Sequence, residues 1–345
     1  MLNIKIGKRI ISEKNRPLIV AEIGINHFGS LKMAKNIVNE AKKSGAEAVK
    51  VQIHIPEEEM SEEAKKIIPG NSKKNIYKII EENSLSLDNE KKLKQYIEKK
   101  KLIYIATPFS YKAAKWLNDN NVKIFKIGSG ECNNIPFIKY VSSFKKPMII
   151  STGMNTLNQV KKTVKIINKK KIPHALLHCV NLYPVKYKYI RLKRMIKMKK
   201  IFKNSIIGYS DHSIGNDIAI AALGLGAKII EKHFVISKIK KGPDVICSMD
   251  KKELKKLLIS SNRIHEAYGS DKEKILEENV TRRFAFHSVV SKKNINPNDV
   301  LGSHNLTTKR PGTGDYPSYK INSLFGKKAK NFIKENTLIK KKYIK

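Results

Sequence analysis

The sequence has few cysteines and no long hydrophobic run. Cys132, Cys179 and Cys247 are its three cysteines, and no two of them share a CxxC spacing, so neither a disulfide framework nor a cysteine zinc site is predicted. No apolar stretch approaches the roughly 20 residues that span a bilayer, and residues 1–11 lack the hydrophobic centre of a signal peptide. We therefore expect reduced thiols, no membrane span and a cytoplasmic location.

Acidic residues are scarce beside basic ones. The chain has 30 Asp and Glu against 70 Lys and Arg, which gives a formal net charge of +40. Such an excess is typical of proteins that bind nucleic acid or anionic lipid, but it also arises from drift in composition on a solvated face. The lysines are scattered among Ile and Asn, in tracts such as 169–171 and 340–342 at predicted helix ends and loops. This distribution favours the solvated face.

Short apolar runs alternate with helical patterns along most of the chain. The runs predicted as strands cover 18–24, 48–53, 102–108, 122–128, 147–152, 175–180, 206–210 and 227–234. The helical patterns cover 31–43, 88–100, 111–117, 136–144, 157–168, 189–202, 217–225 and 252–267. Eight such repeats with near-continuous apolar strands predict an α/β fold of the (β/α)8 TIM barrel type. A doubly wound open sheet is the alternative.

Two segments fall outside this alternation. Residues 56–87 are polar, charged and longer than a routine connection, so they predict a lid or rim insertion. Beyond residue 270 the composition changes, and we predict a barrel domain over 1–270, a charged linker over 271–283 and a small domain over 284–345. That last domain shows strand-like pieces at 284–290 and 337–339, and turn signals at 296–299 and 311–314. Its size is marginal for independent stability, so we expect it to dock on another surface.

Polar side chains stand where the predicted strands end. The segment 125–131, FKIGSGE, brings a lysine, a hydroxyl, two glycines and a carboxylate to one strand exit. In a barrel the carboxyl ends of all strands meet at the face that carries active sites. The residues predicted to meet there are Glu22, Lys50, Gln52, Thr107, Lys126, Ser129, Glu131, Ser151, Thr152, Asn181, Tyr183, Ser210, Asp211, His212 and His233.

The residue types at these ends indicate anion binding and proton transfer. Lys50 and Lys126 interrupt buried runs, where an uncompensated charge is costly, and ammonium groups with hydroxyls suit a phosphate and a carboxylate. His212 and His233 follow consecutive strands, so their imidazoles can hold one divalent metal ion with positions left for water and substrate. Glu22, Glu131 and Asp244 are candidate general acids or bases, although each taken alone is also typical of a helix cap or a salt bridge.

A series of ordered motifs carries a resemblance to a known family. They are AEIGINH (21–27), VKVQ (49–52), FKIGSGE (125–131), STGM (151–154), HCVNLYP (178–184), GYSDHS (208–213), EKHF (231–234), GPD (242–244) and CSM (247–249). Together they resemble the bacterial sialic acid synthase (N-acetylneuraminate synthase) family. The segment KRPGTGD (309–315) resembles that family's C-terminal antifreeze-like (SAF) domain.

The resemblance implies a condensation of phosphoenolpyruvate with N-acetylmannosamine to give N-acetylneuraminate and phosphate. It implies that Lys50, Lys126, Ser129, Ser151, Asn181 and Ser210 hold phosphoenolpyruvate, and that His212 and His233 hold Mn²⁺, with Mg²⁺ or Co²⁺ as other candidates. It also implies that Glu22, Tyr183, Asp244 and Arg310 hold the sugar and that Glu131 moves protons near the reacting carbons. Family members form domain-swapped homodimers, which implies that Arg310 acts on the barrel of the partner chain.

Two alternatives stay open at this point. Legionaminic and pseudaminic acid synthases resemble the chain in most of the same motifs and use a different aldose. Residues 310–316, Phe284 and Phe286 are expected to determine which aldose is used, and the sequence of 309–315 favours N-acetylmannosamine. The remote alternative is a basic nucleic-acid-binding protein on an inactive barrel; it expects basic residues interleaved with exposed aromatics, of which 187–200 gives only a loose version. We expect no nucleic-acid partner.

Overall fold

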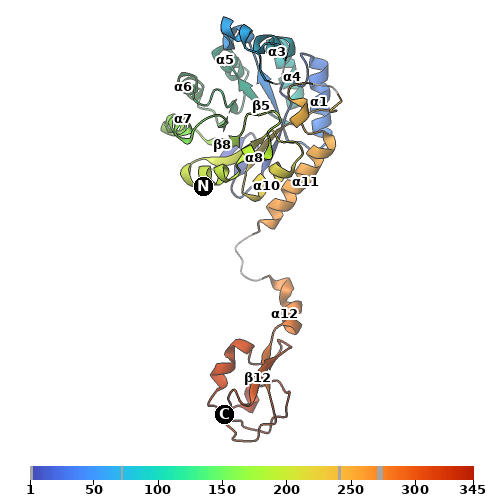
Figure 1. Ribbon diagram of the computed structural model, residues 1–345, viewed down its shortest axis with the longest axis vertical. Coiled ribbons are helices and arrows are strands. Elements are labelled where there is room, and N and C mark those ends of the chain that lie inside the picture. The colour runs from blue at the N-terminus through green and yellow to red at the C-terminus, as the bar shows by residue number, and fades with distance from the viewer. Residues whose placement is uncertain (1–2, 71–72, 240–241, 270–274) are drawn as a thin grey trace. The chain divides into compact units, whose positions relative to one another are not determined.

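The chain divides into two compact units, Met1–Gly269 and Ser270–Lys345. The structure is a computed structural model that describes residues 3–70, 73–239, 242–269 and 275–345, and Figure 1 labels several of its elements. Residues 271–274 of the predicted linker lie outside the described residues. The rest of that segment forms a 3-10 turn, η3 (Leu276–Glu278), and most of a short helix, α12 (Asn279–Ala285).

The first unit is a closed barrel of eight parallel strands. They are β3 (Leu18–Glu22), β4 (Ala48–Ile53), β5 (Ile103–Pro108), β6 (Phe125–Ile127), β7 (Met148–Ser151), β8 (His174–Cys179), β9 (Ile206–Asp211) and β10 (Ile229–His233). Sequential strands are neighbours, and β10 closes the ring on β3 with His233 opposite Glu22. The barrel prediction is confirmed, and the open-sheet alternative is wrong because such a sheet keeps two unpaired edges.

Helices follow the strands and surround the barrel, as Figure 1 shows. They are α1 (Leu31–Lys43), α4 (Leu87–Lys99), α5 (Tyr111–Asp119), α6 (Ile135–Ser143), α7 (Leu157–Lys169), α8 (Tyr187–Ile190), α9 (Lys193–Ile201), α10 (Asp217–Gly224) and α11 (Lys251–Ala267). Several begin at side chains that accept a backbone N–H, such as Ser30, Ser110 and the capping box of Asp250 with Glu253. The single helix predicted over 189–202 is divided, because Arg191 adopts a left-handed conformation (φ 53°) that ends α8.

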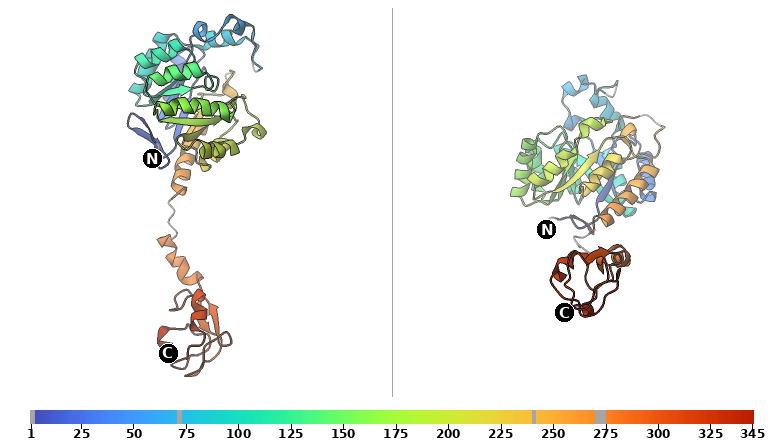
Figure 2. Two further views of the ribbon diagram at one scale, coloured as in Figure 1. Left: turned by 90° about the vertical axis from the view of Figure 1, so that its left-hand side faces the viewer. Right: turned by 60° about the horizontal axis from the view of Figure 1, so that its bottom comes forward.

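An antiparallel hairpin that the sequence analysis did not predict closes one end of the barrel. It consists of β1 (Asn3–Ile6) and β2 (Arg9–Ser12). Its inward residues Ile4, Ile6 and Ile11 are buried in the same apolar cluster as Leu18 and Ile229, at the amino-terminal ends of their strands. Figure 2 shows the hairpin, in dark blue, away from the segment that follows β4. The polar face is therefore at the opposite end.

The polar segment after β4 forms surface elements, in agreement with the predicted rim insertion. It contains α2 (Pro56–Glu59), the 3-10 turn η1 (Glu62–Lys66) and α3 (Ile76–Asn83). Neither α2 nor η1 has a buried residue, and α3 buries only Ile79. Since so little apolar surface is buried, these elements add little to the barrel's stability.

One carboxylate of the helix layer is buried without a hydrogen bond to one of its oxygens. Glu90, on α4, is 2% exposed, and its Oε2 has no hydrogen-bond partner. Burial raises the pKa of Glu90 from 4.5 to about 8. The folded chain therefore holds a proton there that the unfolded chain has already released at neutral pH.

Glu90→Gln is expected to remove a pH-dependent loss of stability. A carboxyl whose pKa rises on folding stabilises the fold below its unfolded pKa, and that contribution is lost as pH rises from about 4.5 through about 8 at about 1.4 kcal/mol per unit. Urea unfolding between pH 5 and pH 9 should show this decline for the parent chain and a flatter profile for Glu90→Gln. The exposed Glu81→Gln is the matched control, and an equal decline in both variants contradicts the assignment.

The second unit is small and built around a short two-stranded sheet. Its strands are β11 (Ser288–Ser291) and β12 (Leu306–Lys309), followed by the 3-10 turns η4 (Ser318–Leu324) and η5 (Lys341–Tyr343). Its core consists of Val289, Ile295, Leu301, Leu306, Leu324, Ala329, Ile333 and Ile339. The strand-like piece predicted over 337–339 is an isolated bridge from Leu338 to Val290 rather than a strand.

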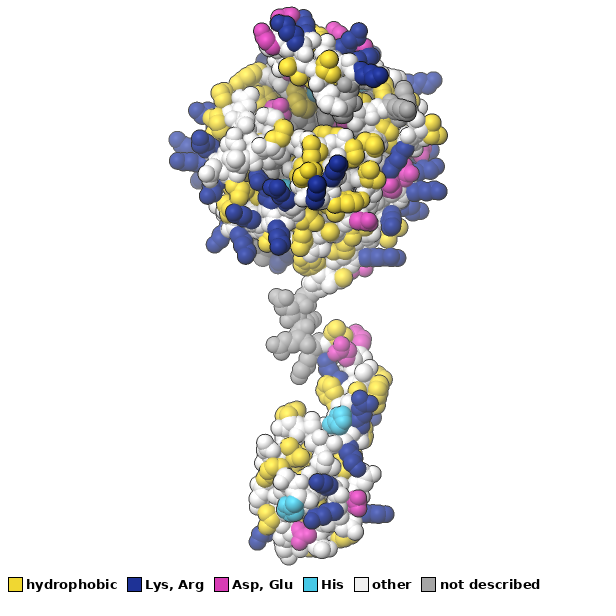
Figure 3. All heavy atoms as spheres, viewed as in Figure 1, with side chains coloured by type: hydrophobic (Ala, Val, Ile, Leu, Met, Phe, Trp, Pro, Cys, Tyr) yellow, Lys and Arg dark blue, Asp and Glu magenta, His cyan; other side chains and the backbone are white. Residues whose placement is uncertain are grey.

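The surface carries its basic residues in a scattered pattern. On the face that Figure 3 shows, Lys and Arg side chains surround the outline of the first unit, with acidic side chains among them. Some lysines pair with a carboxylate one helical turn away, as Lys43 does with Glu40 and Lys115 with Asp119. Within the described residues no helix is long and apolar enough to cross a membrane.

Candidate active site

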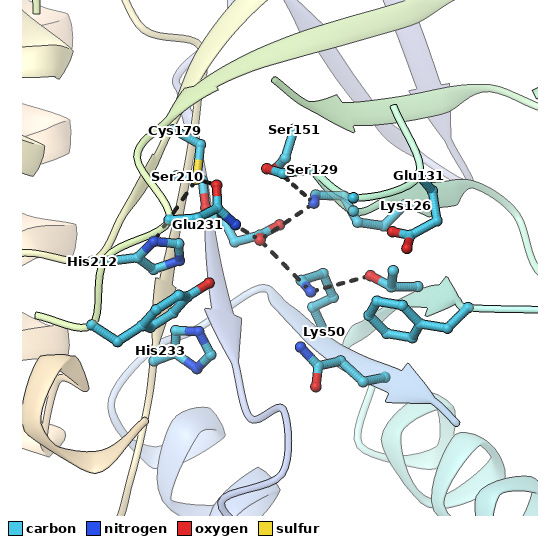
Figure 4. Close-up of a pocket in the computed structure, with 17 residues that line it drawn as sticks. Lys50, Lys126, Ser129, Glu131, Ser151, Cys179, Ser210, His212, Glu231 and His233 are labelled. Atoms are coloured by element: carbon cyan, nitrogen blue, oxygen red, sulfur yellow. Dashed lines mark hydrogen bonds and ion pairs between the residues drawn. The ribbon is translucent and has the colours of Figure 1, made fainter. Parts of the chain in front are cut away.

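A polar pocket of about 180 Å³ opens at the carboxyl ends of the barrel strands. Its size suits a small metabolite, since pockets for drug-sized ligands start at roughly 300 Å³. Figure 4 shows the side chains pointing into it from several strands. Its lining contains ten of the thirteen residues to which the resemblance assigns a role: Lys50, Lys126, Ser129, Glu131, Ser151, Asn181, Tyr183, Ser210, His212 and His233. Gln52 and Thr107, also predicted at this face, line it as well.

Two buried ammonium groups share one carboxylate on the floor of this pocket. The Glu231 Oε1 atom lies 3.6 Å from Lys50 Nζ and 3.5 Å from Lys126 Nζ, and Figure 4 shows Glu231 between the two lysines. Lys50 also pairs closely with Glu22, and Lys126 donates to Ser151 Oγ at 2.8 Å. Each lysine therefore has a charged partner, which is how a buried charge is tolerated.

The protonation of this cluster is uneven. Burial would raise the pKa of Glu231, but Lys126 and Lys50 outweigh it and lower that pKa, so Glu231 is a carboxylate. Burial raises the pKa of Glu22 to about 7, against the opposing pull of Lys50. Burial lowers the pKa of Lys126. The cluster can therefore take up or release a proton near neutral pH when an anion enters.

Small residues make room for the hydroxyl and amide side of the pocket. Ser129 Oγ accepts from Gly153 N at 3.1 Å, and a Cβ at Gly153 would collide with Asn181 Oδ1. A Cβ at Gly128 would likewise collide with the Glu131 carboxylate. The glycines of the FKIGSGE and STGM segments are needed for close approach, and they allow hydroxyl and amide groups to surround an anion.

Two neighbouring imidazoles occupy another side of the pocket. The rings of His212 and His233 lie 5.6 Å apart, and the Tyr183 ring lies 4.1 Å from that of His212. His212 Nδ1 donates to the carbonyl of Val180 at 2.9 Å, which leaves its Nε2 as a free acceptor. Burial lowers the pKa of His233, and its Nδ1 has no hydrogen-bond partner; that atom lies 3.5 Å from Asp244 Oδ2.

This donor set fits a divalent first-row metal ion. Neutral imidazoles are the commonest protein ligands for such ions, and a hydrogen bond from the other ring nitrogen, as His212 makes to Val180, fixes the ligating tautomer. Within the described residues, no group of three or more His, Cys, Asp and Glu side chains is placed to hold a metal. The remaining positions on an ion bound to His212 and His233 would therefore belong to water and substrate.

Glu131 lies across the pocket beside the glycine turn. Burial raises its pKa to about 7, and its Oε2 has no hydrogen-bond partner. A carboxyl with a pKa close to the working pH is suited to general acid and base catalysis. The predicted part in proton transfer thus has a chemical basis in the fold.

Three of the thirteen residues with an implied role lie outside the pocket lining, as do Thr152 and Asp211 from the predicted strand ends. Glu22 is buried behind Lys50, and Asp244 stands next to His233. Arg310 belongs to the second unit, where its Nε donates to the carbonyl of Ala285 at 3.1 Å. Its predicted contact with the sugar stays a prediction.

The sequence analysis quoted Glu231 within a motif but gave it no role. The available signal was the alternation of a strand, since Glu231 stands two residues before His233 and must share its face. The residue between them faces the other way: Lys232 Nζ pairs with Asp211 Oδ2 at 2.7 Å and donates to Ser213 O at 2.5 Å. This buried pair fixes β9 and β10 side by side and so orients both imidazoles.

The sequence profile of the NeuB family matches residues 37–273, and that of the SAF domain matches residues 286–345. The chain belongs to the NeuB family. The resemblance to sialic acid synthases is thereby confirmed, and so is the SAF domain at the carboxyl end.

Relatives of this NeuB-family chain match it over nearly its full length. An N,N'-diacetyllegionaminic acid synthase of Campylobacter jejuni is 35% identical over 94% of this chain and 99% of its own. The N-acetylneuraminate-9-phosphate synthase of Homo sapiens is 32% identical over 93% of this chain and 90% of its own. A pseudaminic acid synthase of Campylobacter jejuni is 30% identical over 93% and 95%. The chain is therefore an enzyme of the nonulosonic acid synthase class.

A solved structure agrees with this assignment. The N-acetylneuraminic acid (sialic acid) synthetase of Leptospira borgpetersenii serovar Hardjo-bovis, in complex with citrate, is 31% identical and superimposes with a TM-score of 0.75. It covers 81% of this chain and 94% of its own. Membership of an enzyme family also counts against the nucleic-acid alternative.

Proposed function

We propose that this NeuB-family enzyme condenses phosphoenolpyruvate with N-acetylmannosamine to form N-acetylneuraminate and phosphate. The observation that supports it most strongly is the pair of buried ammonium groups, Lys50 and Lys126, beside Ser129, Ser151 and Asn181. A small acid with both a carboxylate and a phosphate is the ligand that this charge and this ring of donors suit.

The proposed roles follow the geometry of the pocket. Lys50 and Lys126 neutralise and hold phosphoenolpyruvate, while the serines and Asn181 donate to its phosphate. A divalent ion held by His212 and His233 would act as a Lewis acid toward the aldehyde oxygen. Tyr183 and Asp244 lie next to those imidazoles, and we propose that they orient the sugar.

The reaction then needs one base and one leaving group. Carbon 3 of phosphoenolpyruvate attacks the aldehyde carbon, and positive charge develops at carbon 2. Glu131 accepts a proton from a water that adds there, and the alkoxide formed from the aldehyde takes up a proton to become a hydroxyl. The tetrahedral intermediate then loses its own hydroxyl proton and collapses with cleavage of the C–O bond to phosphate. The carbonyl of the new keto acid forms as phosphate departs, so no oxidant or reductant is required.

Synthase activity is expected to fall as pH drops below about 7. Burial raises the pKa of Glu131 to about 7, so its basic form declines about tenfold per pH unit below that value. The measurement is kcat from phosphate release between pH 5 and pH 9. Glu22 has a similar pKa, so the pH profile of Glu22→Gln separates the two groups. If kcat of this variant still falls below about pH 7, Glu131 is the base; if the fall disappears, Glu22 is the base.

The proposed reaction is tested with phosphoenolpyruvate, Mn²⁺ and a panel of aldoses. Phosphate release and the mass of the product are read for N-acetylmannosamine, its 6-phosphate, and the aldoses that lead to legionaminic and pseudaminic acids. The second candidate aldose is the diacetylated one, because the legionaminic acid synthase of Campylobacter jejuni shares 35% identity. No phosphate release with any aldose would contradict the proposed function.

We also propose that Arg310 of one chain completes the pocket of a partner chain. Arg310 is exposed and lies beside exposed aromatics of the same unit, Phe284 and Phe286, since it bonds to the carbonyl of Ala285 between them. An arginine flanked by exposed aromatic rings is typical of a surface that binds another protein.

Mixing two inactive variants is expected to restore activity if Arg310 acts in trans. A dimer of Lys126→Ala and Arg310→Ala chains contains one complete site, so random reassortment should return about a quarter of parent activity. Each variant alone should stay near background. Lack of any recovery, with mixed dimers demonstrated by differently tagged chains, contradicts action in trans.

A further inference from the structure

A second cavity lies beside the pocket and has no assigned role. It is about 460 Å³ in volume and is lined by the β7–α7 connection, the end of β8 and the α8–α9 turn. It shares Cys179 and Asn181 with the polar pocket, so Asn181 separates the two spaces. Exposed Met154 and Leu182 stand in its lining. We call it the side cavity.

Two guanidinium groups line the side cavity without an acidic partner. They belong to Arg191 and Arg194, and no Asp or Glu is among the lining residues. In the part of the chain that the structure describes, neither arginine has a carboxylate within 4.0 Å. Both arginines belong to one cavity lining, and burial, followed by the charge of Arg191, lowers the pKa of Arg194. Uncompensated neighbouring cations favour a bound anion.

Two buried acceptors in the same lining have no donor. His178, 1% exposed, donates its Nε2 proton to the carbonyl of Ile190 at 2.7 Å, so its Nδ1 accepts, and that atom is unpartnered. Asn155, 5% exposed, donates from Nδ2 to the carbonyls of Ser129 and Gly153, and its Oδ1 is likewise unpartnered. Buried acceptors left without a donor are costly, so a ligand with a hydroxyl proton would satisfy them.

The lining therefore favours an anion that also carries a hydroxyl group. Inorganic phosphate near neutral pH meets both requirements, because its charged oxygens accept from guanidinium groups while its P–OH donates. The phosphate ester of phosphoenolpyruvate lacks that hydroxyl when it is fully ionised, and sulfate lacks it altogether. The P–OH group therefore distinguishes inorganic phosphate, the released product, from fully ionised phosphoenolpyruvate, the substrate.

We propose that the side cavity binds inorganic phosphate as it leaves the active site, with Arg191 and Arg194 as its charged ligands and Asn155 and His178 as its acceptors. This proposal rests on the proposed function, because the phosphate comes from phosphoenolpyruvate. Arg194 Nη2 also donates to the carbonyl of Asn155 at 2.5 Å, and Asn155 bonds to the carbonyl of Ser129. The phosphate side of the pocket and the side cavity are thus joined by direct hydrogen bonds.

The test uses the full chain with both arginines replaced. Arg191→Asn keeps the left-handed backbone that Asn tolerates, and Arg194→Gln keeps a good helix former in α9. The matched control, Lys193→Gln with Lys197→Gln, removes the same charge from exposed positions of α9 outside the cavity. All chains are titrated calorimetrically with phosphate and with sulfate, in the Lys126→Ala background that weakens anion binding in the main pocket.

The arginine pair is expected to raise the phosphate dissociation constant about tenfold or more, and the lysine pair to change it less than about threefold. Phosphate should bind more tightly than sulfate, and His178→Phe should reduce that preference. Equal weakening in the arginine and lysine pairs, or equal binding of sulfate and phosphate, overturns the site. Tighter arginine-dependent binding of N-acetylmannosamine 6-phosphate than of phosphate also overturns it, by assigning the cavity to a substrate.

Kinetics with the Lys126 side chain intact separates this proposal from the proposed function. Product inhibition by phosphate should weaken about tenfold in the arginine pair while nonulosonic acid is still formed. Unchanged inhibition in an active arginine pair overturns the phosphate site and leaves the synthase assignment intact. Arginine-dependent phosphate binding in a parent chain that makes no nonulosonic acid contradicts the proposed function and with it the product role of the cavity.

Discussion

His212→Ala is expected to lower synthase activity about a thousandfold or more while the barrel stays folded. The change removes one of two imidazoles that lie 5.6 Å apart, and among the described residues no third His, Cys, Asp or Glu is placed to hold a metal with them. A single remaining ligand cannot retain an ion whose charge stabilisation supplies several kcal/mol to the transition state. The fold should lose only about 1 kcal/mol with the hydrogen bond to Val180.

The measurement pairs phosphate release with calorimetric titration of Mn²⁺ into the chain freed of metal by a chelator. His233→Ala should behave like His212→Ala in both. His265→Ala, on the outer helix α11, is the matched control and should keep parent activity and metal affinity. Full activity of the parent chain in excess chelator, or unchanged Mn²⁺ affinity of His212→Ala, contradicts the metal assignment.

Lys126→Ala is expected to lower kcat/KM for phosphoenolpyruvate about a hundredfold or more, with a much smaller change in KM for the aldose. Lys126 Nζ is buried, 2.8 Å from Ser151 Oγ and 3.5 Å from Glu231 Oε1, on the side of the pocket assigned to the small acid. Removing one member of a buried, hydrogen-bonded charge pair costs about 2–5 kcal/mol. Glu231 keeps Lys50 at 3.6 Å, so the remaining carboxylate is not left alone.

The matched control is Lys123→Ala, an exposed lysine three residues earlier on the approach to β6. It removes the same charge and should leave both kinetic constants within about twofold of the parent, since exposed charges away from a site contribute little. A larger effect of Lys126→Ala on the aldose than on phosphoenolpyruvate would mean that the two substrates are assigned to the wrong sides.

The barrel and most of the residues at its rim were predictable from the sequence. The spacing of apolar residues indicates the strands, and the place of a polar residue at the end of a strand indicates the rim. Apolar runs ending in Lys50, Lys126 or His233 identified both the strand and the face on which its last side chains lie. The N-terminal hairpin was missed because its alternation over two strands of four residues is too short to stand out. The break at Arg191 was missed because a left-handed arginine has no signal in composition.

The pairing within the site was less predictable. A motif places Glu231 near His233, but its contact with Lys50 and Lys126 depends on strands that are distant in the chain and closed into a ring. The side cavity could not be predicted for the same reason, since Asn155 comes from the β7–α7 connection, His178 from β8 and Arg194 from α9. The aldose follows from none of these features, and relatives named for three different products match the chain at similar identities of 30–35%.

The alternation along β9 and β10 makes these strands intolerant of length changes. Deleting one residue of β10 ahead of these positions would turn Lys232 toward the pocket and turn Glu231 and His233 toward the helix layer. Asp211 would then lose its ion pair with Lys232. A reading-frame-preserving deletion would thus damage chemistry and folding together. Libraries that aim to change the sugar used by this enzyme should therefore vary loop lengths beyond the strand ends and keep the strands themselves at constant length.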